Sequence, residues 1–346
     1  VFAQIIGTLD LIAPEERDRV CGIVINKFRG DAALFADGVR FLTERTGIPV
    51  LGVLPFLRDL ALDQEDSLDV DIRRQVAFQR DCINLAVILL PHMSNFTDFN
   101  ALAGEPDVAL RYAATPEEAA GADAILLPGS KTTLADLAYL RGKGFESLLH
   151  GHVHRGGEVV GICGGYQMLG RRIADPDAVE SGGSGEGLGL LQVTTVLMRE
   201  KITEQVEGRA LYLGGPTAPP VRGYLIHMGR TDRHGHRACF ELQGKEPSPA
   251  GPRDVTERDD AWLDGAMSDD GLVWGTYIHG LFDEPLCRRA WLNRLRIRKG
   301  LPAADMALSQ QVNRQRSGAM DRWADHVEQH LDLAPILALL RHGGTV

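Results

Sequence analysis

Cys163 stands in the segment of this chain whose residue types most clearly suggest chemistry. The preceding run Glu158-Val-Val-Gly-Ile162 is apolar and β-branched, which predicts a buried strand, and the following Tyr-Gln-Met-Leu favours a helix. Because Gly161, Gly164 and Gly165 surround the cysteine, the chain can turn sharply there and present the thiol at the strand's end. This is the pattern of a nucleophile elbow, with Cys in place of Ser.

A helix that starts directly after Cys163 would support a nucleophilic role. Its free N–H groups favour the thiolate form and can also stabilise an oxyanion on a substrate. The alternative is a buried structural cysteine at a strand–helix junction, which is the better interpretation of a lone cysteine. Here the flanking glycines, the apolar strand and a histidine downstream favour the nucleophile.

A cysteine nucleophile needs a base, and His279 is the best candidate. It ends the apolar run Trp274-Gly-Thr-Tyr-Ile and is followed by Gly280, so it repeats the pattern of a strand that ends in a functional residue. The carboxyl ends of parallel strands meet at one edge of a sheet, where sites form in open α/β folds. We therefore expect Cys163 and His279 to meet at that edge. The alternative for His279 alone is a structural turn histidine.

An acyl-transfer site also needs backbone donors for an oxyanion. The segment Gly129-Ser130-Lys131 follows a predicted strand over 124–127, so one N–H can come from Gly129 or Ser130 and another from Gly164. The alternatives are a simple loop into a helix and, for Lys131, a solvated surface charge.

Other polar residues give weaker signals. His227 ends another apolar run and either lines the site or is a core histidine, with equal weight. His150 and His154 have the spacing of metal ligands on a helix, but no carboxylate is spaced with them, so we expect no metal site. The sequence contains no phosphate-binding loop, and it therefore shows no complete nucleotide site.

The elements around these residues predict an α/β protein with two domains. The first would hold helices over 1–13 and 32–46 and strands over 19–26 and 48–54, which form a βαβ unit with a parallel sheet. We predict a first α/β domain over 1–60, a linker over 61–82 with a helix at 69–80, a second α/β domain over 83–300, and a helical extension over 301–346.

The second domain would contain the candidate site. Its predicted strands are 85–90, 124–127, 158–162, 192–197, 222–227 and 273–277, and its predicted helices are 133–141 and 145–154. The Gly-, Ser- and acid-rich stretch 175–189 is interpreted as a loop, and 214–220 and 244–258 as surface insertions. Residues 306–341 are predicted to be mostly helical.

Composition narrows the class of protein. The chain has 346 residues with 44% hydrophobic content and a formal net charge of −10, which disfavours nucleic acid as a partner. Its five cysteines are far apart, so neither a disulfide framework nor a zinc ribbon is expected. No signal peptide and no apolar stretch long enough to span a membrane is visible, so we expect a cytoplasmic protein.

Several motifs together resemble the cobyric acid synthase family of cobalamin biosynthesis. They are GICGGYQMLG around Cys163, LPGSK at 127–131, SNFTDF at 94–99, IHMGRT at 226–231 and GTYIHGLFD at 275–283. INKFRGD at 25–31 and TGIPVLGVLP at 46–55 are similar to the end of that family's synthetase domain. The resemblance covers nearly the whole chain, and its specificity comes from the order of the motifs.

The resemblance implies a class I glutamine amidotransferase domain of the flavodoxin-like type, preceded by the C-terminal part of a parallel-sheet, P-loop-type synthetase domain. Cys163 would attack the amide of L-glutamine, His279 would act as base and acid, and Gln167 would help to position the glutamine. The ammonia would amidate four carboxylates of adenosylcobyrinic acid a,c-diamide. The synthetase part would use ATP and Mg²⁺, and Asn26 would contact the adenine. The oligomeric state stays open, with a homo-oligomer among the alternatives.

Two departures from related enzymes affect the expected mechanism. Many class I glutaminases carry His-x-Glu, whereas this chain has His279-Gly280-Leu281. We therefore expect a weakly oriented His279 and low glutaminase turnover without the acceptor. The family's phosphate loop would lie upstream of Val1, so we interpret the chain as a fragment that hydrolyses glutamine without amidating the corrinoid.

Three rival interpretations remain at this stage. A cysteine α/β-hydrolase of the dienelactone hydrolase type shares the elbow and would need an Asp before the histidine, for which Asp264 or Asp269 could serve. A glutaminase subunit that amidates a cell-wall precursor is disfavoured by the synthetase-like segment and the IHMGRT motif. A docking module with an inactive site is disfavoured by the intact Cys163 and His279.

Overall fold

A computed structural model describes residues 1–31, 33–57, 73–214, 217–244 and 261–341 of the chain. The chain divides into two compact units, one formed by Val1–Leu62 with Arg314–Val346 and the other by Asp63–Asn313. The C-terminal segment thus groups with the N-terminal one. The domain boundaries given above stay a prediction.

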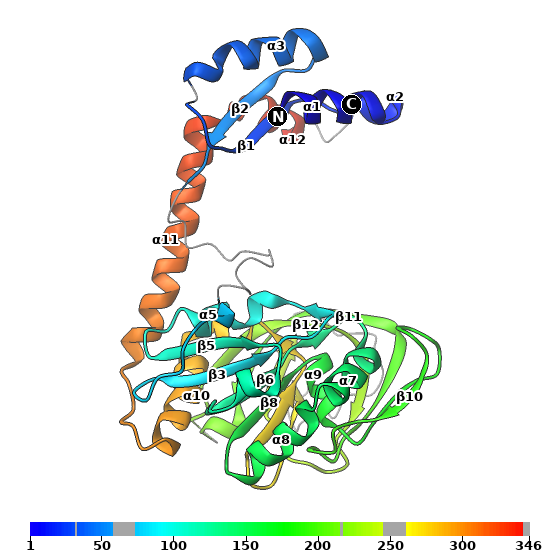
Figure 1. The fold of residues 1–346 in the computed structure, drawn as a ribbon, viewed down its shortest axis with the longest axis vertical. Coiled ribbons are helices and arrows are strands. Elements are labelled where there is room, and N and C mark those ends of the chain that lie inside the picture. Colours follow the sequence, from blue (N-terminus) through cyan, green and yellow to red (C-terminus); the bar gives the residue numbers. More distant parts are fainter. Residues whose placement is uncertain (32, 58–72, 215–216, 245–260, 342–346) are drawn as a thin grey trace. The chain divides into compact units, whose positions relative to one another are not determined.

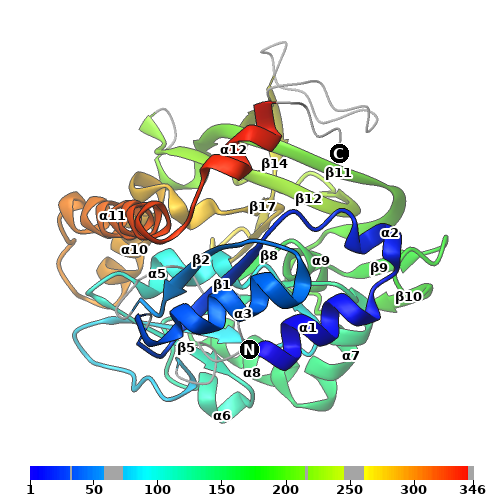
Figure 2. The same cartoon turned by 90° about the horizontal axis from the view of Figure 1, so that it is seen from above.

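The first unit is built on a βαβ element, as predicted. Strands β1 (Ile23–Phe28) and β2 (Val50–Pro55) pair in parallel and are connected through η1 (Ala33–Phe35) and α3 (Ala36–Thr46). Helix α1 (Phe2–Leu11) lies beside α3 (Figure 2), and the short α2 (Pro14–Arg17) follows it. Apolar side chains from this unit form a small core: Leu9, Ile23, Ile25, Leu42 and Ile48.

The C-terminal helices complete this unit. Helix α11 spans Met306–His330 and α12 spans Ala334–Arg341, which confirms the helical character predicted for 306–341. Where α11 ends, the backbone N–H of Asp332 donates to the Leu51 carbonyl at 2.7 Å, and His326 Nε2 donates to the Pro55 carbonyl at 2.9 Å. These bonds attach the C-terminal segment to β2.

The second unit contains a central, mostly parallel sheet in the order β15-β16-β8-β6-β3-β5. The parallel strands are β3 (Ile83–Ile88), β5 (Val108–Ala113), β6 (Ala124–Leu127), β8 (Glu158–Ile162) and β16 (Val273–Thr276), and β15 (Ala266–Met267) is an antiparallel edge. Figure 1 shows β3, β6 and β8 side by side. Their residues are buried throughout, as expected for near-continuous apolar runs in a parallel sheet.

Helices connect and cover these strands. They are α5 (Asn100–Ala103), α6 (Pro116–Ala119), α7 (Thr133–Gly142), α8 (Phe145–His154), α9 (Gly164–Leu169) and α10 (Pro285–Arg298). The helices predicted over 133–141 and 145–154 are confirmed by α7 and α8. The α/β fold class is likewise confirmed.

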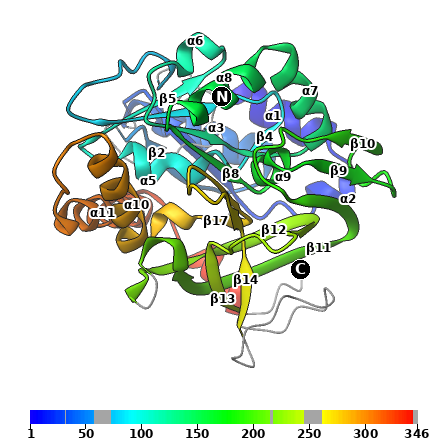
Figure 3. The same ribbon diagram turned by 90° about the horizontal axis from the view of Figure 1, so that it is seen from below.

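A second, mostly antiparallel sheet flanks the first (Figure 3), and within it β9 and β11 pair in parallel. Its strands are β9 (Arg172–Asp175), β10 (Gly183–Glu186), β11 (Thr194–Ala210), β12 (Pro220–Asp232), β13 (Phe240–Gly244), β14 (Ala261–Asp264) and β17 (Ile278–His279). The chain passes from β16 of the central sheet directly into β17, which pairs with β12. His279 therefore lies where the two sheets meet.

Three sequence-based expectations differ from the structure or fall outside it. The stretch 175–189 is not all loop, because β10 pairs with β9 in a hairpin. The helix predicted over 69–80 is wrong for 75–80, where side chains bind the backbone: Arg111 donates to the Val76 carbonyl and Gln79 N–H donates to Asn84. Residues 69–72, 215–216 and 245–258 lie outside the described residues.

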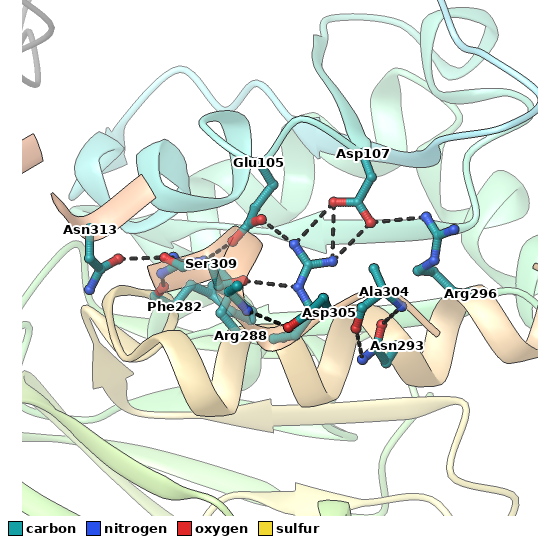
Figure 4. A network of polar contacts seen from close by, with 12 residues as sticks. Glu105, Asp107, Phe282, Arg288, Asn293, Arg296, Ala304, Asp305, Ser309 and Asn313 are labelled. Carbon is teal, nitrogen blue, oxygen red and sulfur yellow. Dashed lines mark hydrogen bonds and ion pairs between the residues drawn. The ribbon is translucent and has the colours of Figure 1, made fainter. Parts of the chain in front are cut away.

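A buried ion network fixes α10 against the start of β5 and of α11 (Figure 4). The side chains of Arg288 and Arg289 are fully buried and both bind the carboxylate of Glu105. Arg289 also pairs with Asp107 at 2.8 Å, and Arg288 donates to the Ser309 carbonyl at 2.8 Å. Buried charges of this kind are tolerated only because each is paired.

Candidate active site

The predicted nucleophile elbow is present. Cys163 follows the fully buried strand β8, adopts φ 51° and ψ −110°, and directly precedes α9. The glycines are required by close backbone approach, since a Cβ on Gly165 would lie 2.1 Å from the Leu127 carbonyl oxygen. A strained, positive-φ residue at such a turn is typical of a functional position.

His279 meets Cys163 although 116 positions separate them in the sequence (279 minus 163). The imidazole is fully buried in β17, and the Cys163 side chain is near enough to act on its pKa. Burial by itself lowers the pKa of His279, but the hydrogen bond to Asp98, the interaction with Cys163 and the charges of both groups raise it to about 10. The imidazole is therefore protonated at neutral pH, beside the sulfur atom.

Asp98 corrects the expectation that His279 lacks an orienting carboxylate. It lies in η2 (Phe96–Phe99), is 5% exposed, and accepts a hydrogen bond from His279 Nδ1 at 2.7 Å. Its other oxygen accepts the Gly280 N–H at 2.9 Å. The amide nitrogen of Asn95 lies 3.0 Å from each ring nitrogen of His279. The carboxylate thus comes from a turn before the elbow, and the imidazole is firmly held.

The predicted backbone donors converge on the same point. Strand β7 (Gly129–Ser130) pairs with β4 (Met93–Ser94), which brings both residues beside the elbow. A Cβ on Gly129 would lie 3.4 Å from His279 Cε1, and a Cβ on Gly164 would lie 2.8 Å from the Ser130 nitrogen. Their role as an oxyanion hole stays a prediction that this placement supports.

Lys131 differs from its neighbours. Its side chain is exposed, while its N–H donates to the His92 carbonyl at 3.0 Å. The solvated-charge interpretation of Lys131 fits this position at least as well as a place in the lining of the site.

Gln167 is buried on α9, one helical turn beyond Cys163. Its amide oxygen accepts from the Thr133 hydroxyl at 3.3 Å, and its amide nitrogen donates to the Tyr277 hydroxyl at 3.3 Å. Sequence reasoning missed Thr133 and Tyr277. The signal that could have found Tyr277 is its place in the same apolar run as His279.

His227 lies near the nucleophile but faces a neighbouring cavity. The sulfur of Cys163 is 3.8 Å from the carbonyl of Ile226, the residue before it. The imidazole stacks on Tyr277 with ring centroids 3.8 Å apart, and Nδ1 donates to the Gly229 carbonyl at 2.8 Å. Together with Tyr277 it lines a cavity of about 680 Å³ between β11, β12 and β14.

Asn26 belongs to the first unit, whereas the residues described above belong to the second. It is exposed, and its side-chain oxygen accepts the N–H of Lys27 at 2.8 Å. Within the described ranges no group of His, Cys, Asp or Glu residues is arranged to hold a metal ion.

The rival hydrolase arrangement is not favoured by this geometry. Asp264 accepts hydrogen bonds from the Thr276 hydroxyl and the Tyr277 N–H, and the carboxylate on His279 is that of Asp98. The chain order is therefore Asp, Cys, His, whereas the hydrolase would need the aspartate between the other two.

A family model for the CobB/CobQ-like glutamine amidotransferase domain matches residues 84–286. The chain belongs to this family. The matched range contains the elbow, Asp98 and His279, so the resemblance inferred from the motifs is confirmed. Cys163, His279 and Asp98 have the arrangement that glutamine hydrolysis by a domain of this family requires.

Several relatives of this chain are named cobyric acid synthase. The protein from Citrobacter koseri is 45% identical over 99% of this chain and 65% of its own length. Those from Klebsiella pneumoniae and Synechocystis are 44% and 41% identical, over 65% and 64% of their lengths. The chain thus spans about 65% of the length of these relatives. A solved structure, PurLQS from Thermotoga maritima, aligns with a TM-score of 0.42 at 15% identity, over 68% of this chain and 98% of that one.

No helix within the described residues is both long and apolar enough to cross a membrane.

Proposed function

We propose that this chain is the glutaminase-bearing portion of a cobyric acid synthase. The observation that carries the proposal is the buried contact between Cys163 and His279 at a nucleophile elbow, with Asp98 holding the imidazole. The identity to curated cobyric acid synthases over almost the whole chain supports the same assignment. The amidotransferase domain would extend over residues 83–300.

The first half-reaction would convert L-glutamine into a thioester. The Cys163 thiolate attacks the side-chain amide carbon, and the N–H groups near Gly129, Ser130 and Gly164 bind the oxyanion that forms. When this intermediate collapses, the C–N bond breaks and protonated His279 gives its proton to the leaving nitrogen. Ammonia departs, and the glutamyl group remains on the sulfur.

The second half-reaction would release glutamate. His279 is neutral after giving up its proton, so it can accept one from a water molecule that attacks the thioester. The C–S bond then breaks, and the thiolate and the protonated imidazole are restored. Asp98 stabilises the imidazolium in both resting and reacting states, because its carboxylate accepts the Nδ1–H bond at 2.7 Å.

In the whole protein the ammonia would amidate four carboxylates of adenosylcobyrinic acid a,c-diamide. ATP with Mg²⁺ would activate each carboxylate by phosphorylation in the synthetase part. In this chain the side-chain oxygen of Asn26 already accepts the Lys27 N–H, and the sequence has no glycine-rich phosphate loop. These residues alone do not fit a nucleotide, so no step is assigned to ATP here.

The test is a pair of assays on purified chain. Ammonia and glutamate release from L-glutamine is measured for the wild type and for Cys163→Ser, and the mass of the corrinoid acceptor is followed in the presence of ATP and Mg²⁺. We expect glutamine hydrolysis that is lost in Cys163→Ser, with no change in corrinoid mass. ATP-dependent amidation by this chain alone would contradict the assigned division of labour, and hydrolysis that persists in Cys163→Ser would contradict the nucleophile.

A further inference from the structure

The Gly-, Ser- and acid-rich segment that follows β9 brings a carboxylate to the candidate glutamine site. Its anchor is Asp175, which is 1% exposed and accepts the backbone N–H groups of Val179, Glu180, Ser181 and Gly182 at 2.7 to 3.1 Å. Burial acts to raise the pKa of Asp175, but these hydrogen bonds outweigh it and lower the pKa. The charged carboxylate thus fixes the backbone from which Glu180 projects.

Glu180 reaches the residues that surround the nucleophile. Its carboxylate accepts the Thr133 N–H at 2.5 Å and the Thr133 hydroxyl at 3.1 Å. The same hydroxyl lies 3.3 Å from the amide oxygen of Gln167. A Cβ on Gly164, the residue after Cys163, would lie 3.4 Å from it. A single side chain, that of Thr133, therefore stands between Glu180 and the elbow.

The electrostatic surroundings of Glu180 favour a cation. In the described part of the chain no Lys, Arg or His is found in an ion pair with it, and the carboxylates of Asp175 and Asp136 are near enough to raise its pKa. Burial, supported by these two carboxylates, raises the pKa of Glu180 despite the bonds from Thr133. A half-buried carboxylate without a cationic partner is costly, and such groups concentrate where a ligand supplies the partner.

We infer that Glu180 binds the α-ammonium group of L-glutamine and so selects an amino acid over an amide that lacks the amino group. This inference rests on the proposed function. The carboxamide of glutamine must lie at Cys163, and its α-ammonium is at the other end of a short aliphatic chain. Glu180 stands one side chain away from the elbow, at the N-terminal end of α7. The competing interpretation is that Glu180 serves only as a cap of α7.

The experiment compares two substrates on purified chain. One is L-glutamine and the other is 4-carbamoylbutanoate, which has the same carboxamide and carboxylate but no amino group. In Glu180→Gln we expect kcat/KM for L-glutamine to fall by about 10- to 150-fold, the range typical of a charge-assisted hydrogen bond, mainly through KM. For 4-carbamoylbutanoate kcat/KM should stay within about threefold of wild type. Glu180→Asp should recover part of the loss.

The control is Glu186→Gln, which changes an exposed glutamate on the neighbouring strand β10 and should leave both values unchanged. The thermal unfolding temperature of each variant measures how much Glu180 stabilises the protein as a cap of α7. Equal losses for the two substrates in Glu180→Gln would overturn the inference in favour of the cap. A wild-type chain that hydrolyses neither substrate would overturn the proposed function and the inference with it, whereas hydrolysis of L-glutamine with unaltered discrimination in Glu180→Gln would overturn the inference alone.

Discussion

Replacing Asp98 by asparagine tests the orientation of His279 with little change in shape. The carboxylate now accepts the His279 Nδ1–H at 2.7 Å and the Gly280 N–H at 2.9 Å. The asparagine side chain could keep the second bond through its oxygen. The asparagine amide nitrogen, however, would donate a hydrogen bond to His279 Nδ1. This would favour the neutral tautomer of His279 that carries its proton on Nε2. That tautomer cannot take a proton from the thiol.

The expected magnitude follows from these two effects. A hydrogen bond to a charged group contributes about 1.5–3 kcal/mol, and each 1.36 kcal/mol changes a rate tenfold, so loss of the bond alone costs about 10- to 150-fold. Holding the imidazole in the wrong tautomer can cost roughly 10⁴-fold in comparable triads. We therefore expect kcat of Asp98→Asn to fall by roughly 10²- to 10⁴-fold at neutral pH.

The assay is glutamine hydrolysis together with alkylation of Cys163 by iodoacetamide as a function of pH. The charge of Asp98 helps to raise the pKa of His279 to about 10, so its removal should lower that pKa and change the pH profile of alkylation. Asp177→Asn, an exposed change of the same type, is the control. Wild-type turnover and an unshifted profile in Asp98→Asn would refute the assigned role.

The remaining predictions concern stability. Gly165→Ala should lower the unfolding free energy by about 3 kcal/mol, because its Cβ would lie 2.1 Å from a carbonyl oxygen of β6, whereas Gly142→Ala, with open space around it, should be near neutral; urea denaturation measures both. The raised pKa of His279 adds stability that is complete below about pH 6.5 and is lost as pH rises to about 10. The stability difference between wild type and His279→Gln should therefore shrink over that window by at most about 1.4 kcal/mol per pH unit, and a constant difference would contradict it. Glu105→Gln should cost about 3–5 kcal/mol, since it leaves two fully buried arginines short of their charge partner, while kcat/KM for glutamine should change little; a loss of activity without a loss of stability would count against a structural role.

Much of the site could be predicted because its residues lie at strand ends. The elbow at Cys163 and the position of His279 follow from apolar strands that end in a functional residue and glycine. The meeting of such ends at one sheet edge is a general property of parallel sheets. The local sequence was therefore sufficient to predict that Cys163 and His279 lie at strand ends on the same edge of the sheet.

Asp98 could not be predicted in the same way. It lies 181 positions before His279, in a short 3-10 turn and not at the end of a strand, and its role is evident only from the tertiary contact with His279. Glu180 was similarly hidden in a segment interpreted as a loop. The length of β11 and β12 was underestimated because their outer halves are polar and partly exposed, so hydrophobic alternation fades along them.

The most direct test of the glutaminase assignment is labelling by 6-diazo-5-oxo-norleucine, a glutamine analogue that alkylates glutaminase cysteines. The purified chain is treated with the analogue, with and without excess L-glutamine, and the adduct is mapped by mass spectrometry. The free cysteines Cys21, Cys82, Cys239 and Cys287 serve as internal controls. We predict a single adduct on Cys163 that excess glutamine suppresses. Labelling that spares Cys163, or that glutamine does not suppress, would contradict a glutamine site built on the contact between Cys163 and His279.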